Sequence, residues 1–219
     1  MDVLKVLREM CGVKKAAVLF DIDGTVIESK KFHLSSWIQA LCEIQPGSKN
    51  VADLIGGGSD LAIMQSVLKD ISLSGATKVS LRKAEIFAQI VEDEILPLIE
   101  GFRQFVDGLK KSDVRVGAYT NCCRETADLM LRNAGIADCF EIYICADDVI
   151  SAKPNGEGYT LLCELFNVDP HEAVIFEDSL TGVNAGIDAG IDIIYVGTSS
   201  EDIAKLVVRS IESFEDLLT

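Results

Sequence analysis

At 219 residues, with 48% hydrophobic and 25% charged positions, the chain has the size and composition of an ordinary globular protein with one core or slightly more. Its 35 acidic and 20 basic residues give a net charge of −15, which repels phosphate backbones and argues against nucleic acid as a partner. An anionic substrate would therefore have to be attracted by a local cation or a metal ion, because the overall field repels it.

The N-terminal residues 1–13 carry charged side chains every few positions. This pattern predicts a short amphipathic helix ending at Gly12, not a secretory signal or a membrane span. The seven cysteines are scattered and lack C-x-x-C spacing, which is typical of reduced thiols. We therefore expect a cytoplasmic protein that has no membrane partner, and nothing in the sequence requires more than a monomer.

Short apolar runs recur along the chain, and each is nearly continuous, as in strands that are covered on both faces. They lie at 16–23, 114–121, 140–147, 173–179 and 191–198. Helical patterns lie between them, at 101–112, 124–135, 157–167 and 182–190. This alternation predicts an α/β fold, a Rossmann-like parallel sheet with helices on both faces.

The segment 32–97 interrupts this alternation. It holds helical patterns at 32–44, 59–71 and 80–96 and no apolar run that resembles the strands. We interpret it as an α-helical cap inserted into the α/β core. The predicted core domain is 1–30 together with 99–219, and the predicted cap domain is 31–98.

Polar and charged side chains stand at the carboxyl ends of the predicted strands. Asp21 and Asp23 end the first strand, Thr120-Asn121 the second and Glu177-Asp178 the fourth, while Lys153 lies in the loop after the third. Ligands of open α/β sheets bind at this edge. The sequence therefore predicts one pocket that contains several carboxylates, a hydroxyl, an amide and an ammonium group.

So many carboxylates cannot lie close together unpaired, because like charges raise one another's pKa. A divalent cation resolves the conflict, and oxygen ligands without a His/Cys set favour Mg²⁺ over Zn²⁺. Lys153 and Thr120 would then bind the remaining oxygens of a phosphate group. These residues predict a site for phosphoryl transfer.

The spacing of the two aspartates gives them separate roles. On an extended backbone Asp21 and Asp23 point to the same side, with Cα atoms roughly 6.5–7 Å apart. Asp21 would attack phosphorus and form an aspartyl-phosphate, and Asp23 would protonate the leaving group and then activate water. Gly24 allows a sharp turn beside the phosphate site, and Thr25 can hold that turn by hydrogen bonding.

With these motifs in this order, the sequence resembles the haloacid dehalogenase superfamily over nearly its whole length. The motifs are "DIDGT" (21–25), "YTN" (119–121), "AKP" (152–154) and "EDS" (177–179). The resemblance implies Mg²⁺ bound by the Asp21 side chain, the Asp23 carbonyl and Asp178, with Glu177 adjacent. It also implies phosphate binding by Thr120, Asn121 and Lys153. The second aspartate, absent from the dehalogenases, favours the phosphatase and phosphomutase branches.

The cap offers candidate specificity residues. His33 and Trp37 share one helix face, which resembles the substrate-facing segment of the β-phosphoglucomutase branch and equally fits cap packing. Gly57 and Ser59 lie in "LIGGGSD" (54–60), which is either a turn or the loop that contacts the substrate. The mutases that this chain resembles have a K-G-x-x-R pattern in this loop, and this chain has Ile55 and Ser59 at the places of the two cations.

We therefore expect a Mg²⁺-dependent phosphomonoesterase that acts on a small phosphorylated metabolite, with a sugar phosphate as the favoured class. A β-phosphoglucomutase is the alternative, and the missing cap cations and Cys122-Cys123 argue against it. A regulatory protein without catalysis on the same scaffold is a further alternative, which the complete set of motifs disfavours.

Overall fold

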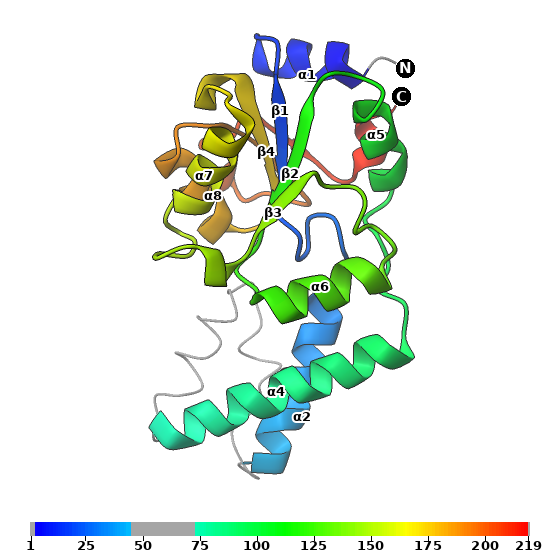
Figure 1. The fold of residues 1–219 in the computed structure, drawn as a ribbon, viewed down its shortest axis with the longest axis vertical. Coiled ribbons are helices and arrows are strands. Elements are labelled where there is room, and N and C mark those ends of the chain that lie inside the picture. The colour runs from blue at the N-terminus through cyan, green and yellow to red at the C-terminus, as the bar shows by residue number, and fades with distance from the viewer. Residues whose placement is uncertain (1–2, 45–72, 219) are drawn as a thin grey trace. The chain divides into compact units, whose positions relative to one another are not determined.

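The computed structural model describes residues 3–44 and 73–218, and the chain separates into two compact units (Figure 1). Residues 1–28 and 97–219 form one unit, and residues 29–96 form the other. The predicted division placed the inserted segment at 31–98.

The first unit is built on a six-stranded parallel sheet in the order β3-β2-β1-β4-β5-β6. The strands are β1 (Ala17–Phe20), β2 (Arg115–Tyr119), β3 (Ile142–Ile144), β4 (Ala173–Glu177), β5 (Asp192–Val196) and β6 (Arg209–Ile211). Strands β2 and β3 follow β1 on one side, and β5 and β6 follow β4 on the other, so the direction of the strand order switches between β1 and β4. The predicted Rossmann-like sheet is confirmed.

The helices of this unit connect the strands. They are α1 (Val3–Cys11), α5 (Phe102–Leu109), α6 (Arg124–Asn133), α7 (Glu157–Phe166), α8 (Leu180–Asp188) and α9 (Glu201–Ala204), with 3₁₀ turns η3 (Ala146–Asp148), η4 (Pro170–Glu172) and η5 (Phe214–Leu217). In Figure 1, α7 and α8 lie on one side of the sheet and α5 on the other. No helix among the described residues is long and apolar enough to cross a membrane.

Alternate residues of the central strands supply two different cores. Phe20 and Phe176 occupy the same register position on β1 and β4, and their rings stack at a centroid distance of 5.2 Å. Phe102, Phe105 and Phe214 pack around Phe20 at centroid distances of 5.5, 6.4 and 5.9 Å. Leu19 and Ile175, one position earlier on each strand, belong to the core beneath α7 and α8. All are fully buried, as expected for strands covered on both faces.

Strand β6 was not predicted. It is three residues long, and only Ile211 is buried, so it lacks the continuous apolar run of the other strands. It forms because its backbone pairs with β5 at the sheet edge. The 3₁₀ turn η5 then carries Phe214 back into the aromatic core.

The two connections between the units pair with each other. Ile27 and Leu98 form an antiparallel bridge. The Glu28 amide donates to the Pro97 carbonyl at 2.8 Å, and the Ile99 amide donates to the Val26 carbonyl at 3.0 Å. The inserted segment therefore leaves and re-enters the first unit through adjacent, hydrogen-bonded strands of chain.

The second unit contains α2 (Lys30–Ile44) and α4 (Leu73–Asp93). They pack through buried apolar residues that include Trp37 and Leu41 on α2 and Val79 and Ile86 on α4. Helix α4 begins at Leu73, ahead of the predicted start at 80, although 73–79 contains serine, glycine and threonine, which are poor helix formers. Burial of Val79 against α2 outweighs this low propensity. The predicted helix at 59–71 lies outside the described residues.

The aromatic core makes the C-terminal turn a structural part of the sheet. Replacing Phe214 with Ala should lower the free energy of unfolding by about 3–5 kcal/mol, because it removes a fully buried ring and leaves a cavity. Ile150→Ala, at a residue that is 96% exposed, is the control and should change it by less than about 0.5 kcal/mol. Urea unfolding followed by circular dichroism measures both, and equal midpoints for the two variants would contradict this account.

Candidate active site

The carboxyl edge of the sheet brings the sequence motifs together, because β2, β1 and β4 are neighbours. Asp21 follows β1, and its amide donates to the Phe176 carbonyl of β4 at 2.9 Å. Thr120 follows β2 and Glu177 ends β4. Residues about 150 positions apart in the chain are therefore adjacent at the point where the strand order switches.

Lys153 is the electrostatic centre of this edge. Its side chain is 3% exposed, and Nζ lies 2.7 Å from Asp21 Oδ1 and 2.6 Å from Glu177 Oε1. Burial by itself lowers the pKa of Lys153, but the charges of Asp21 and Glu177 outweigh it and hold the pKa well above its usual value. The ammonium group therefore stays charged, as the predicted role in phosphate binding requires.

Glu177 is completely buried, and both of its oxygens accept hydrogen bonds. Oε1 accepts from Lys153 and from the Tyr159 hydroxyl, the latter at 3.2 Å. Oε2 accepts from the Asp178 amide at 3.0 Å and from the amide and hydroxyl of Ser179 at 3.2 and 3.1 Å. These contacts indicate that Glu177 holds Lys153 and the turn into α8, and leave it poorly placed to be a direct metal ligand.

The acidic side chains at this edge offer clustered carboxylate oxygens, which suit a divalent cation. Oxygens of Asp21, Glu177 and Asp178 lie within 4.8 Å of one another. Asp21 and Glu177 share the Lys153 ammonium and Asp178 lies beside them, so the three carboxylates carry two more formal negative charges than the ammonium balances. Asp21 Oδ2 is buried and has no hydrogen-bond partner among the residues that the structure describes. A cation at this oxygen would satisfy both the charge and the orphaned acceptor.

The electrostatics of Asp21 support the same fit. Burial, and after it the charge of Glu177, raise the pKa of Asp21 well above its usual range, against the opposing effect of Lys153. A cation beside Asp21 would lower this pKa and favour the ionised carboxylate that the predicted nucleophile requires. Asp178 is held close by Thr25, whose hydroxyl donates to Asp178 Oδ1 at 3.3 Å. Asp21 and Asp178 are thus the side chains best placed to hold a metal ion.

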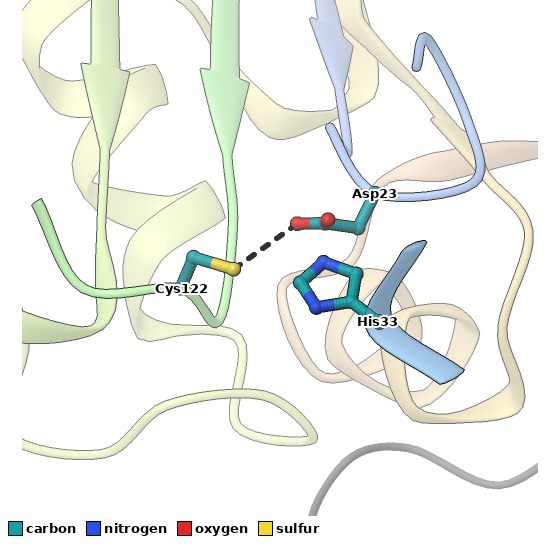
Figure 2. Close-up of side chains that lie close together, drawn as sticks. All are labelled: Asp23, His33 and Cys122. Carbon is teal, nitrogen blue, oxygen red and sulfur yellow. Dashed lines mark hydrogen bonds between the residues drawn. The ribbon is translucent and has the colours of Figure 1, made fainter. Parts of the chain in front are cut away.

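Asp23 is half-buried and is held by the loop that follows β2. Its Oδ2 accepts from the Thr120 hydroxyl and from the Cys122 thiol, each at 3.2 Å. Figure 2 shows the Cys122 side chain directed at this carboxylate. The Cys122 amide in turn donates to the Thr120 oxygen at 3.0 Å. The hydroxyl proton of Thr120, expected to bind phosphate, is therefore directed at Asp23.

Sequence reasoning gave Cys122 no role at this site. The only available signal was its position two residues after Thr120, in a loop that the sheet brings to the edge. In the structure Cys122 is half-buried and Cys123 is exposed. All seven cysteines lie within the described residues, and all are free thiols.

Asn121 contacts the main chain of Lys153. Its Oδ1 accepts from the Lys153 amide at 3.0 Å, and its Nδ2 donates to the Lys153 carbonyl at 3.1 Å. Both ends of the amide that was predicted to bind phosphate thus fix the backbone that carries the lysine. Gly24 adopts a φ of 84°, which favours glycine, and its amide donates to the Ile27 carbonyl at 2.8 Å to form the predicted turn.

His33 and Trp37, two of the predicted cap residues, lie in the second unit, where they contact α4. The ring of His33 stacks on Phe87 at a centroid distance of 4.1 Å, and His33 Nδ1 lies 2.8 Å from Lys83 Nζ. Because an ammonium group can only donate, Nδ1 accepts this bond. Trp37 is 3% exposed, and Lys83 Nζ lies 5.4 Å from its ring centroid. Gly57, Ser59 and Ile55 lie outside the described residues.

Known proteins resemble this chain in sequence and in fold. The pyrophosphatase PpaX of Bacillus velezensis is 29% identical over 185 residues, covering 83% of this chain and 82% of that protein. A phosphorylated carbohydrates phosphatase of Thermotoga maritima is 26% identical over 185 residues, covering 82% and 83%. The crystal structure of CbbY from Rhodobacter sphaeroides in complex with phosphate matches with a TM-score of 0.79 at 22% identity, covering 93% and 96% of the two chains.

A family model described as haloacid dehalogenase-like hydrolase matches residues 18–196, which include every motif at the carboxyl edge of the sheet. The motifs, the order of the strands and this match agree, and the chain belongs to the haloacid dehalogenase-like hydrolase family.

Proposed function

We propose that this protein is a Mg²⁺-dependent phosphomonoesterase that acts through an aspartyl-phosphate. The observation that carries the proposal is the environment of Asp21, where Lys153 holds one carboxylate oxygen and the other is buried without a partner among the described residues. An acidic side chain arranged in this way is suited to meet a phosphoryl group together with a cation.

Asp21 is the nucleophile in this proposal. Its carboxylate attacks phosphorus, the bond to the leaving oxygen breaks, and the phosphoryl group is transferred to Asp21. Lys153 orients the carboxylate and contributes positive charge where negative charge collects on the phosphoryl oxygens. Asp21 and Asp178 would hold Mg²⁺, which supplies additional positive charge to the phosphoryl oxygens when bound.

Asp23 is the proton carrier. It donates a proton to the leaving oxygen in the first step and accepts one from the attacking water in the second. The hydrogen bonds from Thr120 and Cys122 define the orientation from which it would move to the substrate. Asn121 supports the site from the backbone of Lys153, and Glu177 supports it from the lysine side chain.

A small phosphorylated metabolite is the proposed substrate, and a sugar phosphate is the favoured class. The name of the Thermotoga relative supports a carbohydrate phosphate, whereas the name of the Bacillus relative makes pyrophosphate the compound to test against it. The inserted helical segment, which carries His33 and Trp37, is the proposed source of specificity. Phosphate release from sugar phosphates, carboxylic-acid phosphates and pyrophosphate would identify the class. Conversion of β-glucose 1-phosphate to glucose 6-phosphate without phosphate release would favour a mutase.

The nucleophile can be tested directly. Asp21→Asn should lower the rate of phosphate release from p-nitrophenyl phosphate by at least about 1,000-fold, because an amide cannot replace the attacking carboxylate. Asp107→Asn, at an exposed position on α5, is the matched control and should keep the wild-type rate. Substantial turnover by Asp21→Asn, with the wild-type circular dichroism spectrum, would refute the assignment.

The metal site predicts a change in stability that does not depend on turnover. Mg²⁺ at 100 times its dissociation constant should raise the free energy of unfolding of chelator-treated protein by about 2.7 kcal/mol. Asp178→Asn should weaken this stabilisation, because it removes a charged oxygen next to Asp21. Thermal melting across a Mg²⁺ titration measures both proteins, and Asp107→Asn again serves as the control. Identical Mg²⁺ dependence in wild type and Asp178→Asn would exclude Asp178 as a ligand.

A further inference from the structure

Two tyrosine rings enclose the ammonium group of Lys153. Nζ lies 4.9 Å from the ring centroid of Tyr119 and 5.0 Å from that of Tyr159. The two rings meet edge to face, with centroids 5.1 Å apart and an interplanar angle of 89°. Both tyrosines are completely buried. Their faces are attractive to a cation, and the attraction is strongest where water is absent.

Tyr159 contacts both partners of an ion pair. Its hydroxyl donates to Glu177 Oε1 at 3.2 Å, and Lys153 donates to the same oxygen at 2.6 Å. Its ring covers the ammonium group, so one side chain limits the positions of the lysine and of the glutamate. Asp21 Oδ1, at 2.7 Å, completes the surroundings of Nζ.

The backbone makes room for this arrangement. Tyr119 ends β2, and Tyr159 lies in the first turn of α7. Gly158 precedes Tyr159 in the chain and packs against the Tyr119 ring, where a Cβ atom would lie 2.5 Å from that ring. A residue with a side chain at 158 would therefore displace the ring, so the close approach of α7 to β2 depends on glycine at this position.

We propose that Tyr159, together with Tyr119, is a positioning residue that keeps Lys153 directed at Asp21. A lysine side chain is long and flexible, and its ion pairs with Asp21 and Glu177 restrain only Nζ, so the rest of the side chain would keep its freedom to move. The two ring faces and the shared Glu177 oxygen remove that freedom. This inference rests on the proposed function for its effect on turnover, but the enclosure of Lys153 can be observed without turnover.

The test compares Tyr159→Phe, Tyr159→Leu and the control Tyr143→Phe. Tyr159→Phe keeps the ring and loses the bond to Glu177, whereas Tyr159→Leu loses both. Tyr143→Phe makes the same chemical change at a tyrosine whose hydroxyl donates to Asp128. The first readout is the carbon–proton NMR signal of the Lys153 ε-methylene, assigned through its loss in Lys153→Arg. Ring currents should shift this signal upfield from those of the exposed lysines.

We expect the upfield shift to persist in Tyr159→Phe and in the control, and to diminish in Tyr159→Leu. The second readout, kcat/KM for p-nitrophenyl phosphate, should fall about threefold in Tyr159→Phe and tenfold or more in Tyr159→Leu, and stay within twofold of wild type in Tyr143→Phe. Circular dichroism checks that each variant is folded, and Tyr159→Phe carries the test if Tyr159→Leu is not.

Each contrary outcome has a separate meaning. A wild-type Lys153 signal without an upfield shift would overturn the enclosure. Wild-type kcat/KM in both Tyr159 variants of an active enzyme would overturn the positioning role. A wild-type protein that releases no phosphate, while its Lys153 signal is shifted, would refute the proposed function and leave the enclosure standing.

Discussion

The ion pairs of Lys153 with Asp21 and Glu177 are the interaction on which the carboxyl edge of the sheet depends. A buried ammonium group is costly unless it is fully paired, and a buried carboxylate is costly for the same reason. The structure meets both costs with short contacts of 2.7 and 2.6 Å, contributed by the loop after β3 and by the ends of β1 and β4. Removing Lys153 would leave two carboxylates in the interior without their shared cation.

The surrounding residues follow from this requirement. Asn121 fixes the backbone of Lys153, and the hydrogen-bond donors around Glu177 keep that carboxylate in place. The aromatic rings contribute a weaker attraction that does not compete for the oxygens. These contacts are made by the protein's own residues before any ligand arrives, and such preorganised charges stabilise a transition state most effectively.

Much of this arrangement could be predicted from the sequence. The buried strands are continuous apolar runs, and the reactive side chains stand where those runs end, so Asp21, Lys153 and Asp178 could be placed at one edge of a parallel sheet. The contacts of Asn121 and Cys122 could not, because they depend on loops that the sheet brings together from distant parts of the chain. Strand β6 and the early start of α4 were missed because tertiary packing, not local propensity, stabilises them.

The paired connections at Ile27 and Leu98 have a consequence for how such a protein can diversify. Their hydrogen bonds hold the two ends of the inserted segment together, so the entropy of closing a long excursion is offset at its base. At this base the insertion is therefore joined to the first unit as a short hairpin would be, and the pairing does not depend on the length or sequence of the inserted segment. Selection could exchange or enlarge this segment as a module while the strands that hold Asp21, the proposed nucleophile, keep their register.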